Sequence, residues 1–444
     1  MSTTALPRSD VSAGVGLSGL AGLALWVGVC RNWAAIGAAL DLPGPRLPLA
    51  GPLAALAALL FSGAPMVLWS LLVDRVHRDP ATGLDWDRPR AWSAHREITL
   101  VKLLGLWATW ATIAFAYCVA RWYWADPYRF AMDVLGAAAL PVFVLSMVYV
   151  PWLDRYLKEP RDGAWHFGAM LLGLPGVDRE EVARHVRAWV VKGFFIAFMI
   201  SILPGGFRQI VLGDWRELGG DPVRWSNWLC DAMFLVDVQI AMVGYLLTLK
   251  PLAAQIRSAQ PRLAGWVAAL VCYPPFILMN AGGPLDYHAN TADWGFWLEG
   301  HPALLWGWGM LLVLLTGIYA WATVAFGLRF SNLTYRGVLT NGPYRFCKHP
   351  AYFAKNLFWW ASTLPMLATT HSLVDAVRNT VIMALVSAVY WWRARTEEAH
   401  LSAEDPKYRA YAAWMAEHGL VTAPLRRLGA GWRTRAGAVQ VPAE

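Results

Sequence analysis

The chain has 444 residues and a formal net charge of +8, and its composition excludes an ordinary soluble protein. Hydrophobic residues make up 57% of the chain and charged residues only 15%, whereas an average soluble domain is roughly 25% charged. The five cysteines show no C-x-x-C spacing, so neither a disulfide framework nor a thiolate zinc site is predicted. The composition predicts an integral membrane protein.

Ten apolar stretches predict membrane-spanning helices, which need about 20 residues each. The first is not a cleavable signal peptide, because no small-residue cleavage pattern follows it. The last two are separated by only five residues, which predicts a tight helical hairpin followed by a cytoplasmic amphipathic tail. The expected fold is therefore all-α, a polytopic transmembrane bundle of about ten spans. These spans centre on residues 14–30, 50–73, 99–120, 131–151, 189–207, 228–249, 264–280, 303–328, 356–370 and 376–392.

The distribution of Lys and Arg predicts the orientation of the spans. If the N-terminus is cytoplasmic, most of the 38 Lys and Arg residues fall in segments on the cytoplasmic side of the membrane. We therefore expect a multi-pass protein of the cell inner membrane with both termini in the cytoplasm. This asymmetry accounts for the positive charge, so the lipid bilayer and not nucleic acid is the expected partner.

The composition changes near residue 325, from spans with short loops to a dense polar segment. We therefore divide the chain into an N-terminal transmembrane bundle of unassigned role, residues 1–302, and a C-terminal unit that carries the chemistry, residues 303–444. In the first span, Gly16, Gly19 and Gly22 repeat at a spacing of three. They predict close helix packing and not a nucleotide-binding loop, because no strand precedes them.

Two polar features of the N-terminal bundle keep other functions open. Asp237 lies inside the sixth span, where a carboxylate marks either an ion path or an internal hydrogen bond. A transporter is therefore one alternative. The loop at 280–302 holds acidic residues and histidines but no Lys or Arg, which favours a solvated outer loop over a metal or cationic-ligand site.

The segment at 329–356 is the richest in groups capable of chemistry. Residues 341–343 predict a turn, from which Tyr344 leads toward the membrane. His349 precedes Pro350, which predicts that a helix begins at this proline. Such a helix start offers free N–H groups to an anion, and Tyr352 adds an aromatic face in the first turn. The plainer interpretation is a cationic stop whose His and Tyr anchor the membrane interface.

A second cluster follows the predicted hairpin. Arg393 and Glu397 are one helical turn apart and share a face with Leu401. The hairpin returns the chain to the same side of the membrane, so the two clusters can be neighbours in space beside a wall of tryptophans that includes Trp392. The plainer interpretation is an exposed Arg–Glu pair that contributes only a few tenths of a kcal/mol.

Together these groups suit a zwitterionic, cationic cofactor better than a metal. S-adenosylmethionine has an amino group that an acidic side chain can bind and a carboxylate that N–H donors can bind. Its adenine fits an apolar slot, and its sulfonium is favoured by aromatic faces. A metal wants several ligands that converge, and only His349, Glu397, Glu398 and His400 are near one another. No metal is therefore expected.

The two-part motif resembles the membrane methyltransferases of the isoprenylcysteine carboxyl methyltransferase and phospholipid methyltransferase type. The resemblance covers roughly residues 325–420, the C-terminal quarter of the chain. Its residues are Gly342-Pro-Tyr344, Lys348-His349-Pro350-Ala-Tyr352, then Arg393, Glu397-Glu398-x-x-Leu401 and Tyr408-x-x-Tyr411.

The resemblance implies an S-adenosylmethionine-dependent methyltransferase. Glu397 would hold the amino group of the cofactor, and the backbone of residues 336–339 would line its site. Arg393 would be the catalytic residue that faces and orients the acceptor, with Trp392 beside it in the acceptor-binding wall. The other cofactor-binding residues would be Tyr344, His349, Pro350, Ala351 and Tyr352.

The resemblance also implies the reaction, a direct displacement on a lipophilic or prenylated acceptor at the cytoplasmic membrane face. The acceptor atom belongs to an isoprenylcysteine-like carboxylate, another lipid or a thiol. Two residues depart from the family pattern, since Lys348 stands where Arg is usual and Ala354 where Gly is usual. A sterol-reductase-like membrane enzyme that uses NADPH is the nearest enzymatic alternative, and a non-catalytic membrane scaffold is another.

Overall fold

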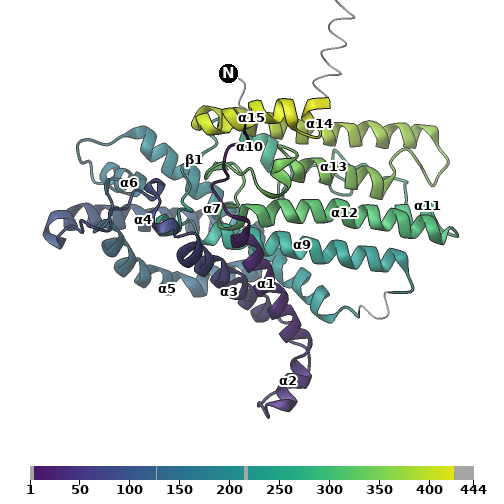
Figure 1. Ribbon diagram of the computed structural model, residues 1–444, viewed down its shortest axis with the longest axis horizontal. Helices are drawn as coiled ribbons and strands as arrows, with labels where there is room; N and C mark the ends of the chain where they lie inside the picture. The colour runs from purple at the N-terminus through teal and green to yellow at the C-terminus, as the bar shows by residue number, and fades with distance from the viewer. Residues whose placement is uncertain (1–4, 127, 215–218, 425–444) are drawn as a thin grey trace, which may run out of the picture.

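The computed structural model describes residues 5–126, 128–214 and 219–424, and it is a bundle of α-helices (Figure 1). In this part of the chain, eight helices are long and apolar enough to cross a membrane, which confirms the predicted polytopic all-α class. These helices are α1 (Ala13–Arg31), α3 (Pro52–Leu68) with its π-helical extension η1 (Trp69–Val73), α4 (Trp92–Ala120), α5 (Arg129–Asp154), α7 (Arg179–Leu212), α9 (Pro222–Leu246), α12 (Pro302–Phe326) and α14 (Leu373–Glu404).

Shorter elements connect the long helices and build the polar end of the bundle. The strands β1 (Ser258–Ala259) and β2 (Thr334–Tyr335) form one antiparallel pair, with Ser258 opposite Tyr335. The short helices are α2 (Trp33–Ala39), η2 (Val76–Arg78), η3 (Pro80–Thr82), η4 (Trp122–Trp124), α6 (Gly163–Leu171), η5 (Lys250–Leu252), α10 (Leu263–Leu270), α11 (Trp294–Trp297), η6 (Gly327–Arg329), η7 (Gly342–Arg345), α13 (Pro350–Thr363) and α15 (Pro406–His418).

Two of the ten predicted spans are not full-length helices. The candidate at 264–280 is helical only in α10, which ends at Leu270 before Pro274 and Pro275. The candidate at 356–370 is the end of α13, which stops at Thr363 because Leu364 turns into the left-handed region and Pro365 follows. In both stretches proline ends a helix that an apolar composition alone would continue.

The segment 271–301 nevertheless returns the chain along the length of α12. β1 pairs with β2 just beyond the C-terminal end of α12, whereas Pro302 begins that helix, which is roughly 37 Å long. Its irregular backbone is bonded to the hairpin: Asn379 donates to the Ala289 carbonyl (2.6 Å), and the Thr369 N–H donates to the Asn290 carbonyl (2.9 Å). Irregular backbone at membrane depth requires such hydrogen bonds to the surrounding protein.

The glycines of α1 lie at close helix contacts, as their spacing predicts. A Cβ atom at Gly16 would lie 1.8 Å from the Val324 carbonyl oxygen of α12, and one at Gly22 would lie 1.9 Å from the Phe61 carbonyl oxygen of α3. Glycine therefore lets the backbones of α1, α3 and α12 approach one another.

Replacing Gly16 by alanine is expected to push α1 away from α12 and to lower the free energy of unfolding by about 1–3 kcal/mol, the usual range for overpacking. Thermal unfolding of the detergent-purified protein measures this loss. Gly28→Ala in the same helix is the matched control, because a Cβ there meets no atom within 4 Å. Equal destabilisation by the two variants would contradict the packing role.

Three charged residues of the N-terminal bundle, Asp237, Lys102 and Asp286, have partners within the fold. Asp237 of α9 accepts hydrogen bonds from Tyr319 and Thr323 of α12, which favours the internal hydrogen-bond interpretation over an ion path. Lys102 of α4 is paired with Asp154, at 2.5 Å. In the loop at 280–302, Asp286 accepts from the backbone N–H groups of Gly282 and His288, both at 2.8 Å.

The hairpin of α13 and α14 lies beside α12 and carries both polar clusters to the same end of the bundle (Figure 1). Helix α15 follows α14 and buries Tyr408, Tyr411 and Met415, the periodicity of an amphipathic helix. The segment before α1 passes beside α15, although the two are separated by nearly the whole sequence (Figure 1). The candidate site lies where these elements meet. Residues 425–444 of the predicted C-terminal unit fall outside the described residues.

Candidate functional site

The structure brings the two predicted clusters into direct contact. Tyr352 of α13 donates a hydrogen bond of 2.8 Å from its hydroxyl to Oε2 of Glu397 in α14. The rings of His349 and Tyr352 are stacked, with centroids 5.4 Å apart, and His349 Nε2 lies 3.0 Å from Oε1 of Glu398. Residues separated by more than 40 positions therefore form one polar surface, where α13 begins and α14 approaches its C-terminal end.

Local sequence explains how the first cluster is held. Gly342 adopts a left-handed φ of 53°, which allows the chain to turn into η7 before Tyr344. Tyr344 is then fixed from α15, because the Tyr411 hydroxyl donates a 2.6 Å hydrogen bond to its carbonyl oxygen. Helix α13 begins at Pro350 with His349 at its N-cap, which confirms the predicted helix start.

The larger of two adjoining pockets, of about 550 Å³, lies between α12, α14, α15 and the loop that follows β2. We call it the upper pocket. It is lined by Phe326, Arg329, Ser331, Thr334, Arg336, Gly337, Val338, Leu339, Tyr344, Lys348, His349, Glu397, Leu401, Tyr408 and Tyr411.

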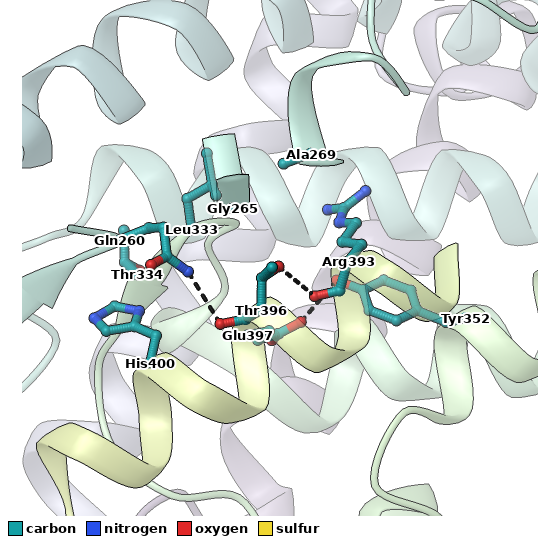
Figure 2. Close-up of a pocket in the computed structure, with 10 residues that line it drawn as sticks. All are labelled: Gln260, Gly265, Ala269, Leu333, Thr334, Tyr352, Arg393, Thr396, Glu397 and His400. Atoms are coloured by element: carbon teal, nitrogen blue, oxygen red, sulfur yellow. Dashed lines mark hydrogen bonds between the residues drawn. The ribbon is translucent and has the colours of Figure 1, made fainter. Parts of the chain in front are cut away.

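The smaller pocket, of about 300 Å³, lies between α10 and α14, and we call it the lower pocket (Figure 2). Thr334 and Glu397 line both pockets, so the two adjoin at this carboxylate. Figure 2 shows the Tyr352 hydroxyl bonded to Glu397 and the guanidinium of Arg393 extending toward Ala269 of α10. The lining residues are Gln260, Gly265, Ala269, Leu333, Thr334, Tyr352, Arg393, Thr396, Glu397 and His400.

The neighbouring carboxylates Glu397 and Glu398 have opposite electrostatic surroundings. Glu398 is in contact with Lys348 (2.6 Å), His349 (3.0 Å) and Arg395 (3.3 Å). In the described part of the chain, no Lys, Arg or His is paired with Glu397, whose bonded neighbour is the neutral hydroxyl of Tyr352. Glu397 therefore presents a negative charge to both pockets.

Arg393 is buried in a cage of aromatic rings beside the lower pocket. Its Cζ lies 5.0 Å from the ring centre of Tyr352 and 5.3 Å from that of Tyr273, both in the range of cation–π contacts. Its Nη2 donates to Oδ1 of Asn332 at 2.6 Å, and Asn332 in turn donates to the hydroxyl of Tyr245. These contacts fix the orientation of the guanidinium without a neutralising carboxylate among them.

The remaining charged groups of the upper pocket are already engaged. Arg336 is buried and donates hydrogen bonds to the carbonyl oxygens of Ala254, Gly244, Phe330 and Leu328, so it holds the loop. Burial, reinforced by the charge of Glu397, raises the pKa of Tyr344 well above its ordinary value. This tyrosine therefore stays a neutral phenol at physiological pH.

The other predicted site residues do not all reach a pocket. Pro350 and Ala351 lie in the first turn of α13 behind the pocket wall, where Ala351 packs against the cluster that contains Tyr344. Trp392 is exposed and is absent from both linings. Lys348, the first departure from the family pattern, lines the upper pocket and forms an ion pair with Glu398. Ala354, the second departure, is fully buried.

Sequence reasoning missed the residues that α10 and distant loops contribute. Gly265 and Ala269 line the lower pocket from a stretch that was expected to be an ordinary span, and Gln260 lines it from just before that stretch. Asn332 and Tyr245 orient Arg393 across a separation of 61 and 148 residues, for which no local pattern exists. Among the described residues, no group of three or more His, Cys, Asp or Glu is arranged to hold a metal ion.

Residues 310–403 match the Isoprenylcysteine carboxyl methyltransferase (ICMT) family, which confirms the resemblance that the C-terminal motifs carry. The match begins within α12 and ends in α14, so it contains His349, Tyr352, Arg393 and Glu397. It supports a membrane methyltransferase. No curated protein and no solved structure matches the chain.

Proposed function

We propose that the protein transfers a methyl group from S-adenosylmethionine to a lipophilic acceptor at the cytoplasmic face of the membrane. The observation that carries this proposal is the position of Glu397, a carboxylate without a cationic partner in the described part of the chain, at the junction of two adjoining pockets. A carboxylate so placed suits a cationic ligand that extends from one pocket toward the other.

The upper pocket fits the cofactor by its donor set. Glu397 would accept hydrogen bonds from the amino group, and His349, the N-cap of α13, lines the same pocket. The rings of Tyr344, Tyr408 and Tyr411 provide apolar faces for an adenine. When bound, this cofactor supplies a methyl group that is already activated by the positive sulfonium.

The lower pocket suits the acceptor. Arg393 is held by Asn332 and the tyrosine cage. It can therefore orient an anionic or polar head group without losing further conformational entropy on binding. Gly265 and Ala269 line the α10 side of the pocket with small residues, against which an apolar tail would pack. An isoprenylcysteine-like carboxylate, another lipid or a thiol is the proposed acceptor class.

The proposal assigns a role to the N-terminal bundle. Residues 303–444 would form the methyltransferase unit, and residues 1–302 would complete the acceptor pocket through α10 and hold the unit in the membrane. The excess of Lys and Arg in alternate loops supports an inner-membrane orientation in which both termini and the site face the cytoplasm.

Calorimetric titration of the detergent-purified full chain with S-adenosylhomocysteine, and separately with NADPH, tests the cofactor. We expect saturable heat with S-adenosylhomocysteine and none with NADPH. Binding of NADPH alone would assign the chain to the membrane reductases. If neither ligand gives binding heat, and a thermal transition shows that the protein is folded, the methyltransferase proposal is overturned.

A further inference from the structure

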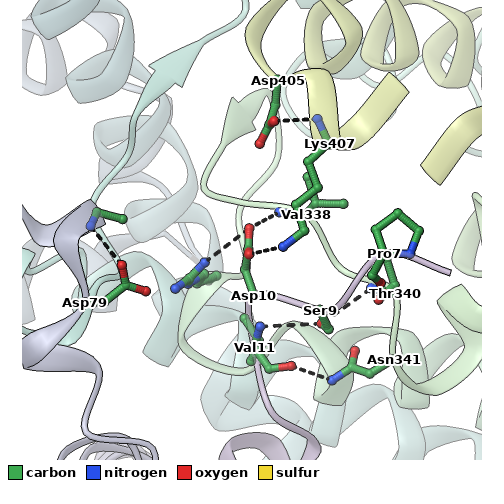
Figure 3. Close-up of polar contacts among 12 residues, drawn as sticks. Pro7, Ser9, Asp10, Val11, Asp79, Val338, Thr340, Asn341, Asp405 and Lys407 are labelled. Carbon is green, nitrogen blue, oxygen red and sulfur yellow. Dashed lines mark hydrogen bonds and ion pairs between the residues drawn. The ribbon is translucent and has the colours of Figure 1, made fainter. Parts of the chain in front are cut away.

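The segment that precedes α1 is bonded to the loop that lines the upper pocket (Figure 3). Its contacts form a continuous series along residues 7–11. The Thr340 hydroxyl donates to the Pro7 carbonyl oxygen (2.7 Å), and the Asn341 side chain donates to the Val11 carbonyl oxygen (2.9 Å). The Asp10 N–H donates to the Val338 carbonyl oxygen (2.9 Å). We call residues 6–11 the strap.

Asp10 is the centre of this series. Its Oδ2 accepts the N–H of Val338 at 2.8 Å, so residues 10 and 338 bond each other in both directions. Lys407 of α15 is hydrogen-bonded to its Oδ1, and Arg329 lies 3.9 Å from its Oδ2. Although burial raises the pKa of Asp10, the contacts with Lys407, Val338 and Arg329 together hold it below the ordinary value, so the carboxylate is ionised at physiological pH.

Gly337 shows how closely the strap approaches the pocket loop. Its φ of 117° lies in a region that favours glycine, and a Cβ there would come within 2.4 Å of Arg329 and 2.8 Å of the Asp10 carboxylate. Gly337 and Val338 themselves line the upper pocket. Arg329, which lies 3.9 Å from Asp10, lines the same pocket, so the charged contacts of Asp10 adjoin the pocket wall.

Two apolar side chains anchor the strap on either side of Asp10. Leu6 packs against the cluster of Val338, Tyr408 and Tyr411, and Val11 is buried against the cluster of Leu339 and Tyr344. All five of these partner residues line the upper pocket. The strap thus supports the pocket wall from the side opposite the ligand space.

We propose that the strap preorganises the upper pocket and that Asp10 is a positioning residue for the cofactor, acting through the backbone of residues 337–341. The consequence for cofactor binding rests on the proposed function, whereas the effect on the loop does not. Without Asp10 the Val338 N–H loses its acceptor, and Arg329 and Lys407 lose the anion between them. The loop would then have to become ordered when the cofactor binds, which weakens affinity.

Hydrogen exchange and calorimetry on the full chain in detergent test this proposal with the variant Asp10→Ala. We expect faster exchange of the amides at 338–341 in the absence of ligand, and S-adenosylhomocysteine binding weakened by about tenfold, as for loss of a charge-assisted hydrogen bond. Asp10→Asn keeps an oxygen acceptor for Val338 and should recover part of both effects. Ser12→Ala is the matched control, because Ser12 donates to Asp74 and not to the pocket loop.

Thr340→Val provides a second route if Asp10→Ala does not fold, since it removes only the bond to Pro7 and Thr340 lies outside the pocket lining. Unchanged exchange at 338–341 in the folded variants would overturn the strap. Faster exchange with unchanged binding of S-adenosylhomocysteine would overturn the positioning role of Asp10. If the unmodified protein does not bind S-adenosylhomocysteine, the proposed function fails, and hydrogen exchange still decides whether the strap orders the loop.

Discussion

Replacing Glu397 by glutamine is expected to weaken the binding of S-adenosylhomocysteine by about 100-fold. The amide has nearly the shape of the carboxylate and can still accept the hydrogen bond from Tyr352, so the fold should be kept. What is lost is the negative charge that faces both pockets. A hydrogen bond to a charged group contributes about 1.5–3 kcal/mol, which corresponds to the expected loss of affinity. Calorimetric titration measures it.

The matched control for this variant is Glu404→Gln, which changes an exposed carboxylate on the same helix. Glu404 is absent from both pocket linings, so its replacement should leave the affinity within about twofold. If Glu397→Gln binds S-adenosylhomocysteine as tightly as the unmodified protein, the carboxylate does not hold the amino group, and the assignment of the upper pocket to the cofactor is wrong.

Replacing Arg393 is expected to reduce methyl transfer about 100-fold while cofactor affinity changes by less than about threefold. The guanidinium lies beside the lower pocket and is fixed by Asn332 and the rings of Tyr273 and Tyr352. Removing one partner of a buried, bonded charge typically costs about 2–5 kcal/mol. The readout is transfer of a labelled methyl group to an S-prenylated cysteine with a free carboxylate, beside titration with S-adenosylhomocysteine.

Two variants separate a role in the reaction from a role in the fold. Arg393→Ala removes the charge and leaves a void, whereas Arg393→Lys keeps the charge but cannot reproduce the planar contacts with Asn332 and the rings. Arg395→Ala is the control. Arg395 lies two residues further along α14, is exposed, and pairs with Glu398 and not with Glu397. Equal losses of turnover and of cofactor affinity in both Arg393 variants would show that this residue supports the whole site and does not face the acceptor.

Much of the fold could be predicted because hydrophobic runs and prolines determine where helices form and end from residues that are close in the sequence. The eight long helices coincide with eight of the ten predicted spans, and α13 begins at Pro350 as the His-Pro dipeptide indicates. The same apolar signal was misleading at 264–280 and 356–370. There, proline ends the helices, and bonds such as that from the Thr369 N–H to the Asn290 carbonyl oxygen hold the irregular backbone.

The candidate site was predictable only in the parts that share a helix or a turn. That the clusters of Tyr352 and Glu397 can be neighbours followed from the hairpin, which returns both to one side, whereas the hydrogen bond between them is seen only in the structure. The contrast between Glu397 and Glu398 was not predictable, because it depends on which of two adjacent side chains meets Lys348 and His349. A rotation of about 100° between consecutive helical residues separates the two outcomes.

The sequence by itself determined the membrane class, the hairpin, the two C-terminal clusters and their family resemblance, because each rests on residues no more than a few turns apart. Only the tertiary structure decided what surrounds these clusters. It brought α10 to the lower pocket, Tyr245 and Asn332 to Arg393, and Asp10 to the loop at 337–341. Such contacts join residues up to several hundred positions apart, and a local pattern carries no information about which distant backbone will pack beside it.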